Sequence, residues 1–306
     1  MSFKSSVSIA PAVQPHVGRF APSPTGPLHA GSLLAALGSW LFARRAGGTW
    51  RVRIEDIDPP RAVPGAAAAQ LDALHACGLV PDGEVLRQST RDGAYRRALD
   101  QLLESGLAFE CHCSRADLAA HGGIHRACAN GRRRADPSVR LRLRDDATVA
   151  FDDVVLGPQV QDVAREAGDV VLRRADGLWA YQLAVVVDDA WQGVTEVVRG
   201  RDLLDSTGRQ VLLQRALGLP TPRYAHLPLV LDAAGRKLSK SDAAAPFDPR
   251  DPLPALAAAW RALGQDPRAV AGADAPAAWL HLAVQAFDLP RLRDAALHNG
   301  DDARAH

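Results

Sequence analysis

The sequence predicts an α/β protein whose core is a parallel sheet built in two halves. A strand, a helix and a second strand follow one another over residues 17–54 and form a βαβ unit. A second group of strands and helices begins at Val170. Between the two groups lies a turn-rich segment that holds three of the four cysteines. With 306 residues, the chain can bury a sizeable core and hold about two domains.

The composition is typical of a soluble globular protein, with 47% hydrophobic and 23% charged residues. The formal net charge of +1 gives no bulk attraction to nucleic acid, so any RNA contact must come from local basic patches. No stretch reaches the roughly 20 apolar residues of a membrane span, and the N-terminus lacks the apolar core of a signal peptide. We therefore expect a cytoplasmic protein with no membrane partner.

The first predicted strand covers residues 17–21 and runs into a loop, residues 22–26, that contains two prolines and a glycine. A helix is predicted to open near Pro27 or Leu28 and to stop at the glycine pair 47–48. Unpaired N–H groups in the first turn of a helix attract phosphate, so the pattern predicts a nucleotide site. Three residues are predicted in that first turn: His29, Gly31 and Ser32. A simple turn before a helix is the alternative.

A second strand is predicted over residues 49–54, where apolar residues alternate with two arginines. The carboxyl ends of neighbouring parallel strands meet at one crevice, so Arg19 and Glu55 are predicted to face the same site. An amino acid carries an ammonium and a carboxylate, and a glutamate with an arginine is the matching pair. An ordinary ion pair at the strand ends is the alternative.

Two helical patterns follow, over residues 66–77 and 95–105, and are interpreted as scaffold helices. Cys77 falls within the first of them and is interpreted as a small buried hydrophobic residue.

The turn-rich segment offers a Cys-x-Cys pair and a His-x-x-Cys pair. Three thiolates and an imidazole make a closed tetrahedral zinc set with no open position for water, so the metal is predicted to be structural. Reduced cysteines beside an unrelated histidine are the alternative. The four predicted ligands are Cys111, Cys113, His125 and Cys128.

Basic residues cluster directly after this set, at Arg126 and at Arg132 to Arg134. Residues 139–144 then alternate apolar residues with arginines, which predicts a strand with one arginine face. Such a surface can follow a phosphate backbone. A solvated strand face is an equally plain interpretation.

The second half is predicted to contain a hairpin around residues 175–177, a strand over residues 194–200 and a helix capped by Asp205 or Ser206. Because Arg199 ends the strand, it is predicted to face the same crevice as the ends of the first two strands.

A further strand over residues 226–232 turns into a loop that carries Lys237 and Lys240. By itself, this pattern is typical of a plain surface loop. Beyond them, helical patterns cover residues 253–263 and 277–287.

Three segments carry a resemblance to a known family. RFAPSPTGPLHAGS resembles the signature of class I aminoacyl-tRNA synthetases in the form used by the glutamyl enzymes, with His29-Ala30-Gly31-Ser32 in the place of His-Ile-Gly-His. RIEDID resembles the segment whose Glu holds the amino group of the substrate. Lys237-Leu-Ser-Lys-Ser241 resembles the Lys-Met-Ser-Lys-Ser loop. The resemblance covers residues 17–245 and implies a Rossmann-like catalytic domain that uses ATP with Mg²⁺ and L-glutamate.

The resemblance also implies roles for individual residues. It assigns catalysis to His29, Lys237 and Lys240, and ATP binding to the same three residues with Gly31 and Ser32. Two arginines and a tyrosine suit a substrate with a second carboxylate, because a buried carboxylate without a partner is costly. For Tyr181, a core aromatic is the alternative. The glutamate-binding residues implied are Arg19, Phe20, Ala21, Pro22, Ser23, Glu55, Tyr181 and Arg199.

The glutamyl family often carries a zinc module between its two halves, with a Tyr where His125 stands here. The predicted division is a first catalytic half over residues 16–110, a zinc-bearing acceptor-binding insertion over 111–169, a second catalytic half over 170–241 and a small helical tail over 242–306. That tail is too short for the large helical anticodon-binding region of a full glutamyl enzyme.

The short tail indicates a shortened member of the family, which we expect to be a monomer. The resemblance then implies activation of L-glutamate to glutamyl-adenylate without tRNA. It also implies transfer to queuosine at the wobble position of tRNA(Asp), presented by the anticodon stem-loop. One alternative is a truncated synthetase that charges a tRNA 3′ end. Another is a non-catalytic, zinc-stabilised RNA-binding module.

Overall fold

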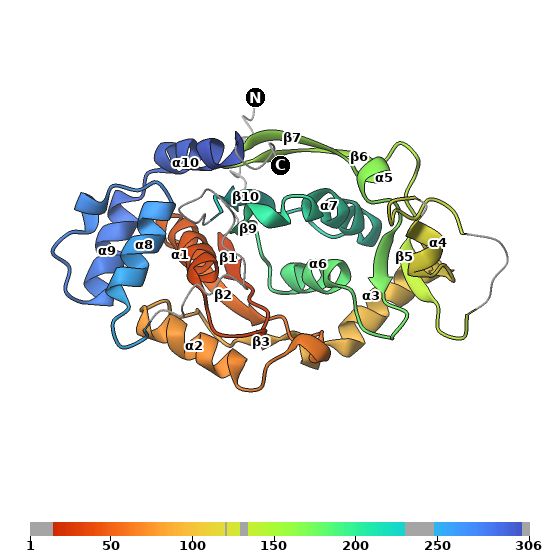
Figure 1. Ribbon diagram of the computed structural model, residues 1–306, viewed down its shortest axis with the longest axis horizontal. Helices are drawn as coiled ribbons and strands as arrows, with labels where there is room; N and C mark the ends of the chain where they lie inside the picture. Colours follow the sequence, from red (N-terminus) through yellow and green to blue (C-terminus); the bar gives the residue numbers. More distant parts are fainter. Residues whose placement is uncertain (1–14, 120, 129–133, 230–247, 302–306) are drawn as a thin grey trace, which may run out of the picture.

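The computed structural model describes residues 15–119, 121–128, 134–229 and 248–301. The described chain forms an elongated molecule with the C-terminal helices at one end and the cysteine-containing segment at the other (Figure 1). Between these ends lie the parallel strands of the core. Within the described ranges, no helix is both long enough and apolar enough to cross a membrane.

The first half is the predicted βαβ unit. Strands β1 (Val17–Phe20), β2 (Thr49–Ile54) and β3 (Leu86–Arg87) are parallel and adjacent in that order. Helix α1 (Ala30–Arg45) connects the first two strands. Gly48 turns the chain into β2 so close to His16 that an added Cβ would lie 2.3 Å from the His16 backbone oxygen. Only glycine fits there, which explains why this helix and strand need a glycine between them.

Helix α1 begins later than predicted. Its N-cap is His29, whose backbone is extended (φ −109°, ψ 172°), so the predicted start near Pro27 or Leu28 is wrong by about one half-turn. The His29 side chain accepts a hydrogen bond from the Ser32 backbone N–H, which stabilises the helix end at this position. Gly31 and Ser32 therefore lie in the first turn as predicted, whereas His29 precedes it.

The connection from β2 to β3 consists of a 3₁₀ turn (Pro59–Arg61) and α2 (Ala66–Ala76), and a second 3₁₀ turn (Gln88–Thr90) leads into α3 (Asp92–Glu104). Both scaffold helices are confirmed to within a few residues. Cys77 is fully buried at the end of α2, also as predicted.

The second half contains β9 (Glu196–Gly200) and β10 (Arg223–Leu227), which are parallel, with α7 (Ser206–Leu217) between them. Helix α6 (Tyr181–Trp191) precedes β9, and a 3₁₀ turn (Arg201–Leu203) follows it. Strand β10 starts and ends earlier than the predicted 226–232. Because Pro228 has no N–H, it cannot continue the ladder.

The two halves join along β1 and β9. The backbone N–H of Thr195 donates to the Val17 carbonyl over 2.9 Å, and the Val17 N–H donates to Thr195 Oγ1, also over 2.9 Å. The hairpin of β6 (Thr148–Asp153) and β7 (Gly157–Asp162) adds to the other side of this half, because β6 pairs with β10 in parallel. The division into four regions stays a prediction, and this hairpin shows that part of residues 111–169 contributes to the sheet of the second half.

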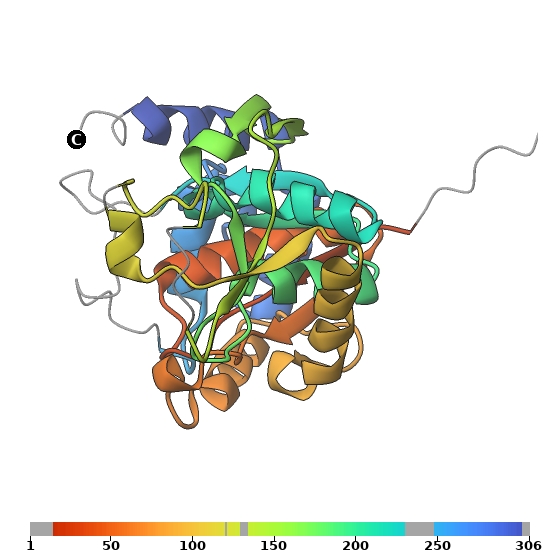
Figure 2. The ribbon, with the colours of Figure 1, turned by 90° about the vertical axis from the view of Figure 1, so that its right-hand side faces the viewer.

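A separate antiparallel sheet is formed by β4 (Ala108–Cys111), β5 (Ser138–Leu141) and β8 (Val170–Arg173). The short helix α4 (Arg115–Ala119) accompanies this sheet, whereas α5 (Val163–Glu166) contacts β6 and β7. Figure 2 shows the yellow α4 and the gold α3 on opposite sides. The predicted hairpin after β8 is confirmed by a hydrogen bond of 3.0 Å from the Gly177 N–H to the Arg174 carbonyl.

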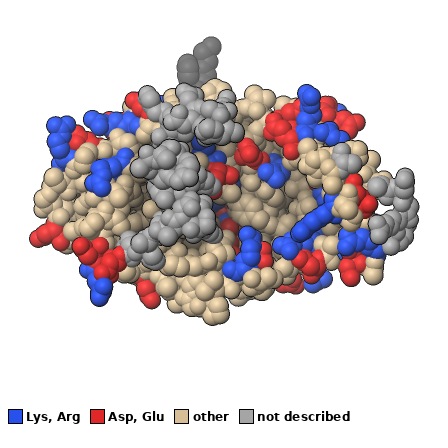
Figure 3. All heavy atoms as spheres, viewed as in Figure 1, with Lys and Arg blue, Asp and Glu red and all other residues tan. Residues whose placement is uncertain are grey.

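The C-terminal helices are α8 (Leu253–Ala262), α9 (Pro276–Ala286) and α10 (Leu289–Asp301), with a 3₁₀ turn (Pro267–Val270) after the first. The first two were predicted and the third was not. Their apolar side chains join those of α1 and the first half in one hydrophobic cluster, so the tail is part of the main core. On the face in Figure 3, basic and acidic side chains are intermixed, in agreement with the net charge of +1.

Candidate functional site

A cavity of about 1180 Å³ opens where β1, β2 and β9 end. Its walls come from the loop after β1, the start of α1, the end of β2, the start of α6 and the end of β9. This is the position at which open parallel sheets bind ligands. Every predicted ATP or glutamate residue within the described ranges lines it: Arg19, Phe20, Ala21, Pro22, Ser23, His29, Gly31, Ser32, Glu55, Tyr181 and Arg199.

Lys237 and Lys240 lie outside the described residues, as do Arg132 and Arg133. The described chain reaches Leu229, which itself lines the cavity.

The start of α1 presents its first-turn backbone to the cavity. Besides capping the helix, His29 lies with its Nε2 atom 3.0 Å from Ser32 Oγ. Gly31 lies directly beneath the imidazole, and an added Cβ would come within 3.3 Å of His29 Cε1. The free N–H groups and the positive end of the helix dipole suit a phosphate here.

A chain of alternating charges lies at the base of the cavity. The Arg19 Nε–H donates to Asp189 Oδ1 over 3.2 Å, and Arg53 Nη1 donates to the same oxygen over 2.7 Å. Arg53 also donates through Nη2 to Glu55 Oε1 over 3.2 Å. All four side chains are buried, and Arg53 is fully so. The two predicted residues, Arg19 and Glu55, are therefore held by two residues that the sequence analysis did not select.

The pKa values of the two carboxyl groups in this row of charges are shifted in opposite directions. Burial raises the pKa of Glu55 above its usual value, because Arg53 and Arg19 only partly offset the lost hydration. Burial would also raise the pKa of Asp189, but Arg19 and Arg53 together outweigh it and the pKa is lowered. Asp189 is thus ionised at the centre of this row of charges. The ionised form of Glu55 would be stabilised by a further positive charge nearby.

Arg53 and Asp189 carried a weak signal in the sequence. In residues 49–54, apolar residues alternate with Arg51 and Arg53, a pattern typical of a strand with one covered face. Strand β2 is instead covered on both faces, as is usual for a parallel strand, and the Arg53 side chain meets the end of α6. A signal for Asp189 was present in the sequence, because Asp188 and Asp189 are adjacent acids in a helix that is mostly apolar.

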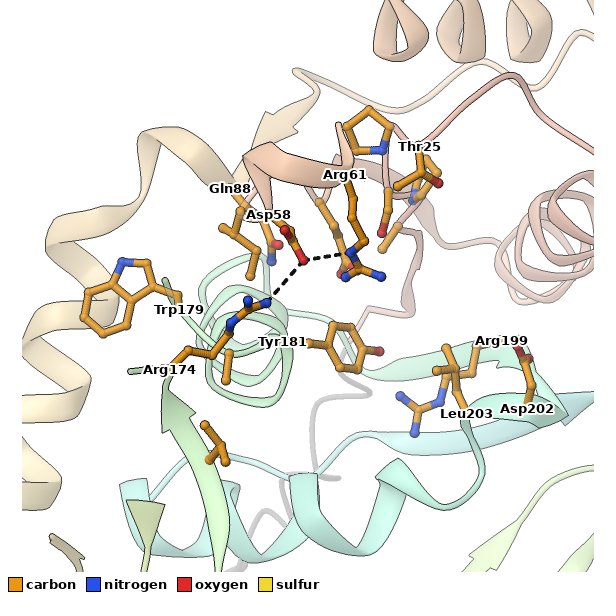
Figure 4. A pocket seen from close by; sticks show the side chains of 18 of the residues that line it. Thr25, Asp58, Arg61, Gln88, Arg174, Trp179, Tyr181, Arg199, Asp202 and Leu203 are labelled. Carbon is orange, nitrogen blue, oxygen red and sulfur yellow. Dashed lines mark hydrogen bonds and ion pairs between the residues drawn. The ribbon is translucent and has the colours of Figure 1, made fainter. Parts of the chain in front are cut away.

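Tyr181 and Arg199 complete the inner part of the cavity. Tyr181 begins α6, and Figure 4 shows its ring between Arg174 and Arg199. Burial raises the pKa of the Tyr181 hydroxyl, so this group remains a hydrogen-bond donor. Arg199 is 4% exposed, and its guanidinium donates to three neighbours: Thr207, Gln210 and His226.

The outer rim is closed by ion pairs. Asp58 follows β2, and its Oδ2 atom lies 2.8 Å from Arg61 Nε and 3.5 Å from Arg174 Nη1 (Figure 4). Arg174 belongs to the hairpin after β8, so the rim joins the first half to the antiparallel sheet. Cys113, Ser114, Arg115 and Leu118 continue the wall toward the cysteine-containing segment.

The predicted zinc ligands come together. One donor atom from each of Cys111, Cys113, His125 and Cys128 lies within 4.8 Å of the other three. Cys111, Cys113 and His125 are buried, whereas Cys128 is exposed. Nitrogen and sulfur donors at this spacing fit a tetrahedral zinc ion.

His125 has a partner that supports a metal-binding orientation. Its Nδ1 atom lies 2.8 Å from Asp169 Oδ2, and its Nε2 atom lies 3.7 Å from Cys128 Sγ, on the side of the thiols. A histidine that donates one ring N–H to a carboxylate presents the other nitrogen to a metal. The sequence analysis missed Asp169, because nothing in the local pattern links it to a histidine 44 positions earlier.

The predicted strand over residues 139–144 is shorter than expected. Strand β5 ends at Leu141, and the three arginines have separate partners. Arg140 donates to the Asp169 carbonyl, Arg142 lies 4.4 Å from the centroid of the Phe109 ring, and Arg144 pairs with Asp146. Phe109 pairs with Arg140 across the β4–β5 ladder, so Arg140 and Arg142 lie on the same face, but the regular strand ends before Arg142.

Comparisons with known proteins agree with this geometry. The model of the catalytic domain of the class I tRNA synthetases (E and Q) matches residues 16–135 and 124–248. A protein of Xanthomonas axonopodis pv. citri named glutamyl-Q tRNA(Asp) synthetase is 65% identical, over 92% of this chain and 94% of its own length.

Two solved structures are also similar. A glutamate-tRNA synthetase from Elizabethkingia anophelis is 32% identical with a TM-score of 0.67, and the match covers 75% of this chain. The chain spans 53% of the length of that enzyme. A glutamate tRNA ligase from Elizabethkingia meningosepticum, solved in complex with its amino acid, is 26% identical with a TM-score of 0.71. That match covers 95% of this chain and 70% of the ligase.

The βαβ unit, the cavity at the strand ends, the family match over most of the sequence and the high identity to curated relatives lead to one conclusion. The chain is an enzyme of the ligase class and belongs to the class I tRNA synthetases (E and Q), in the group whose members are named glutamyl-Q tRNA(Asp) synthetase.

Proposed function

We propose that this enzyme activates L-glutamate with ATP to glutamyl-adenylate without tRNA, and then transfers the glutamate to the queuosine base at the wobble position of tRNA(Asp). The observation that carries the first step is the meeting of Arg19, Glu55, Tyr181 and Arg199 in one cavity beside the start of α1. The name shared by the most similar relatives supports the acceptor.

In the proposed activation, Glu55 holds the ammonium of the substrate, and Arg19, Tyr181 and Arg199 hold its carboxylates. The N–H groups at the start of α1, with Gly31 and Ser32, receive phosphate oxygens of ATP, which brings its Mg²⁺. A substrate carboxylate oxygen attacks the α-phosphorus, the bond to the bridging oxygen breaks, and pyrophosphate leaves. Because no side-chain nucleophile is needed, positioning and charge stabilisation supply the catalysis.

His29, Lys237 and Lys240 have proposed roles at the phosphates. The two lysines neutralise the charge on the departing pyrophosphate, and His29 keeps the start of α1 in order through its hydrogen bonds to Ser32. In the transfer step, a hydroxyl of the queuosine cyclopentenediol attacks the glutamyl carbonyl, an ester forms, and AMP leaves.

The proposed zinc site would be structural. Cys111, Cys113, His125 and Cys128 would hold one ion and leave no position for water. The ion would supply a cross-link between β4, the following turn and the loop that carries His125. We further propose that the enzyme acts as a monomer.

Activation is tested by ATP–pyrophosphate exchange with glutamate, aspartate and glutamine, each without tRNA. Exchange with glutamate alone is expected. Equal exchange with aspartate or glutamine contradicts the assignment of the substrate. No exchange with any of the three would favour a non-catalytic RNA-binding module, an alternative that family membership argues against.

The acceptor is tested by transfer of labelled glutamate to tRNA(Asp) with and without queuosine, each with and without its terminal CCA. Labelling is expected to require queuosine and to survive loss of CCA. The opposite pattern would identify a shortened synthetase that charges the 3′ end, which is the second candidate function.

A further inference from the structure

Two fully buried side chains lie behind Arg199 and do not line the cavity. His226 belongs to β10 and Asp153 ends β6, and their side chains are 0% exposed. His226 Nδ1 lies 2.6 Å from Asp153 Oδ2. On the other edge of the imidazole, His226 Nε2 lies 3.1 Å from Arg199 Nε. The three side chains thus form one line from β6 through β10 to β9.

The donors in this line fix the tautomer of His226. An arginine Nε–H can only donate, so His226 Nε2 must accept and carries no proton. The proton is therefore on Nδ1, where it is donated to Asp153. A carboxylate that selects a histidine tautomer in this way also fixes the orientation of the ring.

Asp153 is itself held by the backbone. Its Oδ1 atom accepts from the N–H groups of Val155, Leu156 and His226, over 3.0, 2.9 and 3.2 Å. Its position is therefore set by the turn after β6 and by the backbone of β10. A side chain that is held by several backbone hydrogen bonds can in turn hold the group that it contacts in one orientation.

Arg199 is pinned on the side away from the cavity. Its Nη1 atom donates to Gln210 Oε1 over 2.8 Å, and its Nη2 atom donates to Thr207 Oγ1 over 2.7 Å. With the bond to His226, three of the five guanidinium N–H groups have protein acceptors. Among the described residues, the two others, one on each Nη, have no acceptor, so they can donate to a ligand carboxylate.

We propose that His226 and Asp153 are positioning residues for recognition of the amino-acid substrate. Asp153 selects the tautomer, and the His226 imidazole then sets the direction of the Arg199 guanidinium toward the substrate carboxylate. Neither residue touches the substrate. This inference rests on the proposed function, because it takes Arg199 as a carboxylate-binding residue.

The central test compares two substitutions of one residue. In His226→Asn, the amide nitrogen can replace Nδ1 as donor to Asp153, but Arg199 loses its acceptor. In His226→Gln, the longer amide can bring an oxygen to the place of Nε2, so Arg199 keeps an acceptor and Asp153 loses its donor. Both variants remove the ring, and both are expected to lower the melting temperature.

The readout is glutamate-dependent ATP–pyrophosphate exchange. His226→Asn is expected to raise the KM for glutamate at least about tenfold, since a hydrogen bond to a charged group is lost, with the KM for ATP changed less than about twofold. His226→Gln is expected to recover most of that loss. An equal rise of the glutamate KM in both variants, or a parallel rise of the ATP KM, would show a purely structural role.

Asp153→Asn provides a second route that leaves the ring in place. An Asn amide donates to Nδ1 and so moves the ring proton to Nε2, where it opposes the Arg199 Nε–H. The glutamate KM is expected to rise as in His226→Asn, and an unchanged value overturns the proposal even if His226→Asn fails to fold.

Ser39→Ala serves as the control for a lost buried hydrogen bond. The Ser39 hydroxyl is buried and accepts a hydrogen bond from Trp50 Nε1 over 3.0 Å. Neither residue lines the cavity. This variant is expected to lower the melting temperature with no change in the glutamate KM. If the parent enzyme shows no exchange with glutamate, the proposed function fails. If the parent exchanges and the histidine variants do not differ, only this inference fails.

Discussion

At the scale of single residues, the base of the cavity depends on one carboxylate. Asp189 Oδ1 accepts from both Arg19 and Arg53, and Arg53 in turn holds Glu55. The proposed ligands for the two ends of an amino acid are therefore connected through Asp189. Two arginines buried side by side would repel each other without this anion. Asp189 therefore stabilises the fold and also holds the proposed substrate-binding residues in place.

We expect Asp189→Asn to raise the glutamate KM roughly 10- to 100-fold and to destabilise the fold by about 3–5 kcal/mol, because it leaves two buried arginines short of a partner. The neighbouring Asp188 is the matched control. It is also buried, but it accepts from Gln88, Arg91 and Tyr95. Asp188→Asn should lower stability with a much smaller change in KM. Similar KM values for the two variants, measured by pyrophosphate exchange, would contradict the role of Asp189.

The raised pKa of Glu55 predicts a pH dependence of substrate binding. A protonated Glu55 cannot pair with the ammonium of glutamate, so affinity should fall as the pH drops toward the raised pKa of this group, above the ordinary value of 4.5. Binding adds a positive charge beside Glu55 and lowers its pKa, so protons should be released on binding in this range. Calorimetric titration with glutamate from pH 8 to pH 5 measures both effects. Glu55→Gln should bind weakly at every pH, and a slope that persists in this variant would point to another group.

At the scale of elements, the candidate zinc site depends on a close backbone contact. Gly168 lies at φ +62°, and an added Cβ would be 2.1 Å from the His125 carbonyl oxygen. The next residue, Asp169, donates its backbone N–H to that oxygen and contacts the imidazole with its carboxylate. The loop before β8 therefore sets both the backbone and the ring of His125.

Gly168→Ala is expected to displace His125 and to weaken zinc binding roughly 10- to 100-fold. Gly193→Ala is the control, because Gly193 has a similar φ of +67° but an added Cβ there would meet nothing within 4 Å. Competition with a chromogenic zinc chelator measures the affinity of each variant. Equal zinc affinities of the two variants would mean that the close contact at Gly168 is not needed to position His125. A parent protein that contains no zinc would refute the metal proposal itself.

At the scale of the whole molecule, the C-terminal helices are a structural part of the catalytic core. Trp260 in α8 is fully buried, donates through Nε1 to the Asp266 carbonyl and packs edge-on against Trp279 of α9. The same hydrophobic cluster contains Leu33, Leu37 and other residues of α1, whose first turn faces the cavity. The tail therefore supports the helix that presents the proposed phosphate site.

We expect Trp260→Ala to destabilise the protein by about 3–5 kcal/mol, because it leaves a large cavity in the hydrophobic cluster that the tail shares with α1. Trp191→Ala should cost less than about 1 kcal/mol, since Trp191 is 63% exposed and the Arg91 guanidinium lies over its ring. Denaturant unfolding provides both values. A small effect of Trp260→Ala would mean that the tail is dispensable for the core.

The local elements of the fold could be predicted from the sequence because local rules decide them. The βαβ unit, the scaffold helices, the hairpin after β8 and two tail helices follow from periodicity and from glycines and prolines at their ends. The errors lie where a tertiary contact overrides the pattern. The late start of α1 depends on the side chain of His29, and the short β5 depends on where its partner strands allow pairing.

The candidate site divides in the same way. The sequence by itself determined that Arg19, Glu55 and Arg199 meet in the cavity, because strand ends are local features and parallel strands bring them to one edge. The family resemblance added Tyr181 and the loop after β1. Only the tertiary structure decided what holds those residues: Asp189 and Arg53 behind Arg19, His226 and Asp153 behind Arg199, and Asp169 behind His125. These partners are tens to more than a hundred positions away, and a buried charge needs a partner without specifying which residue supplies it.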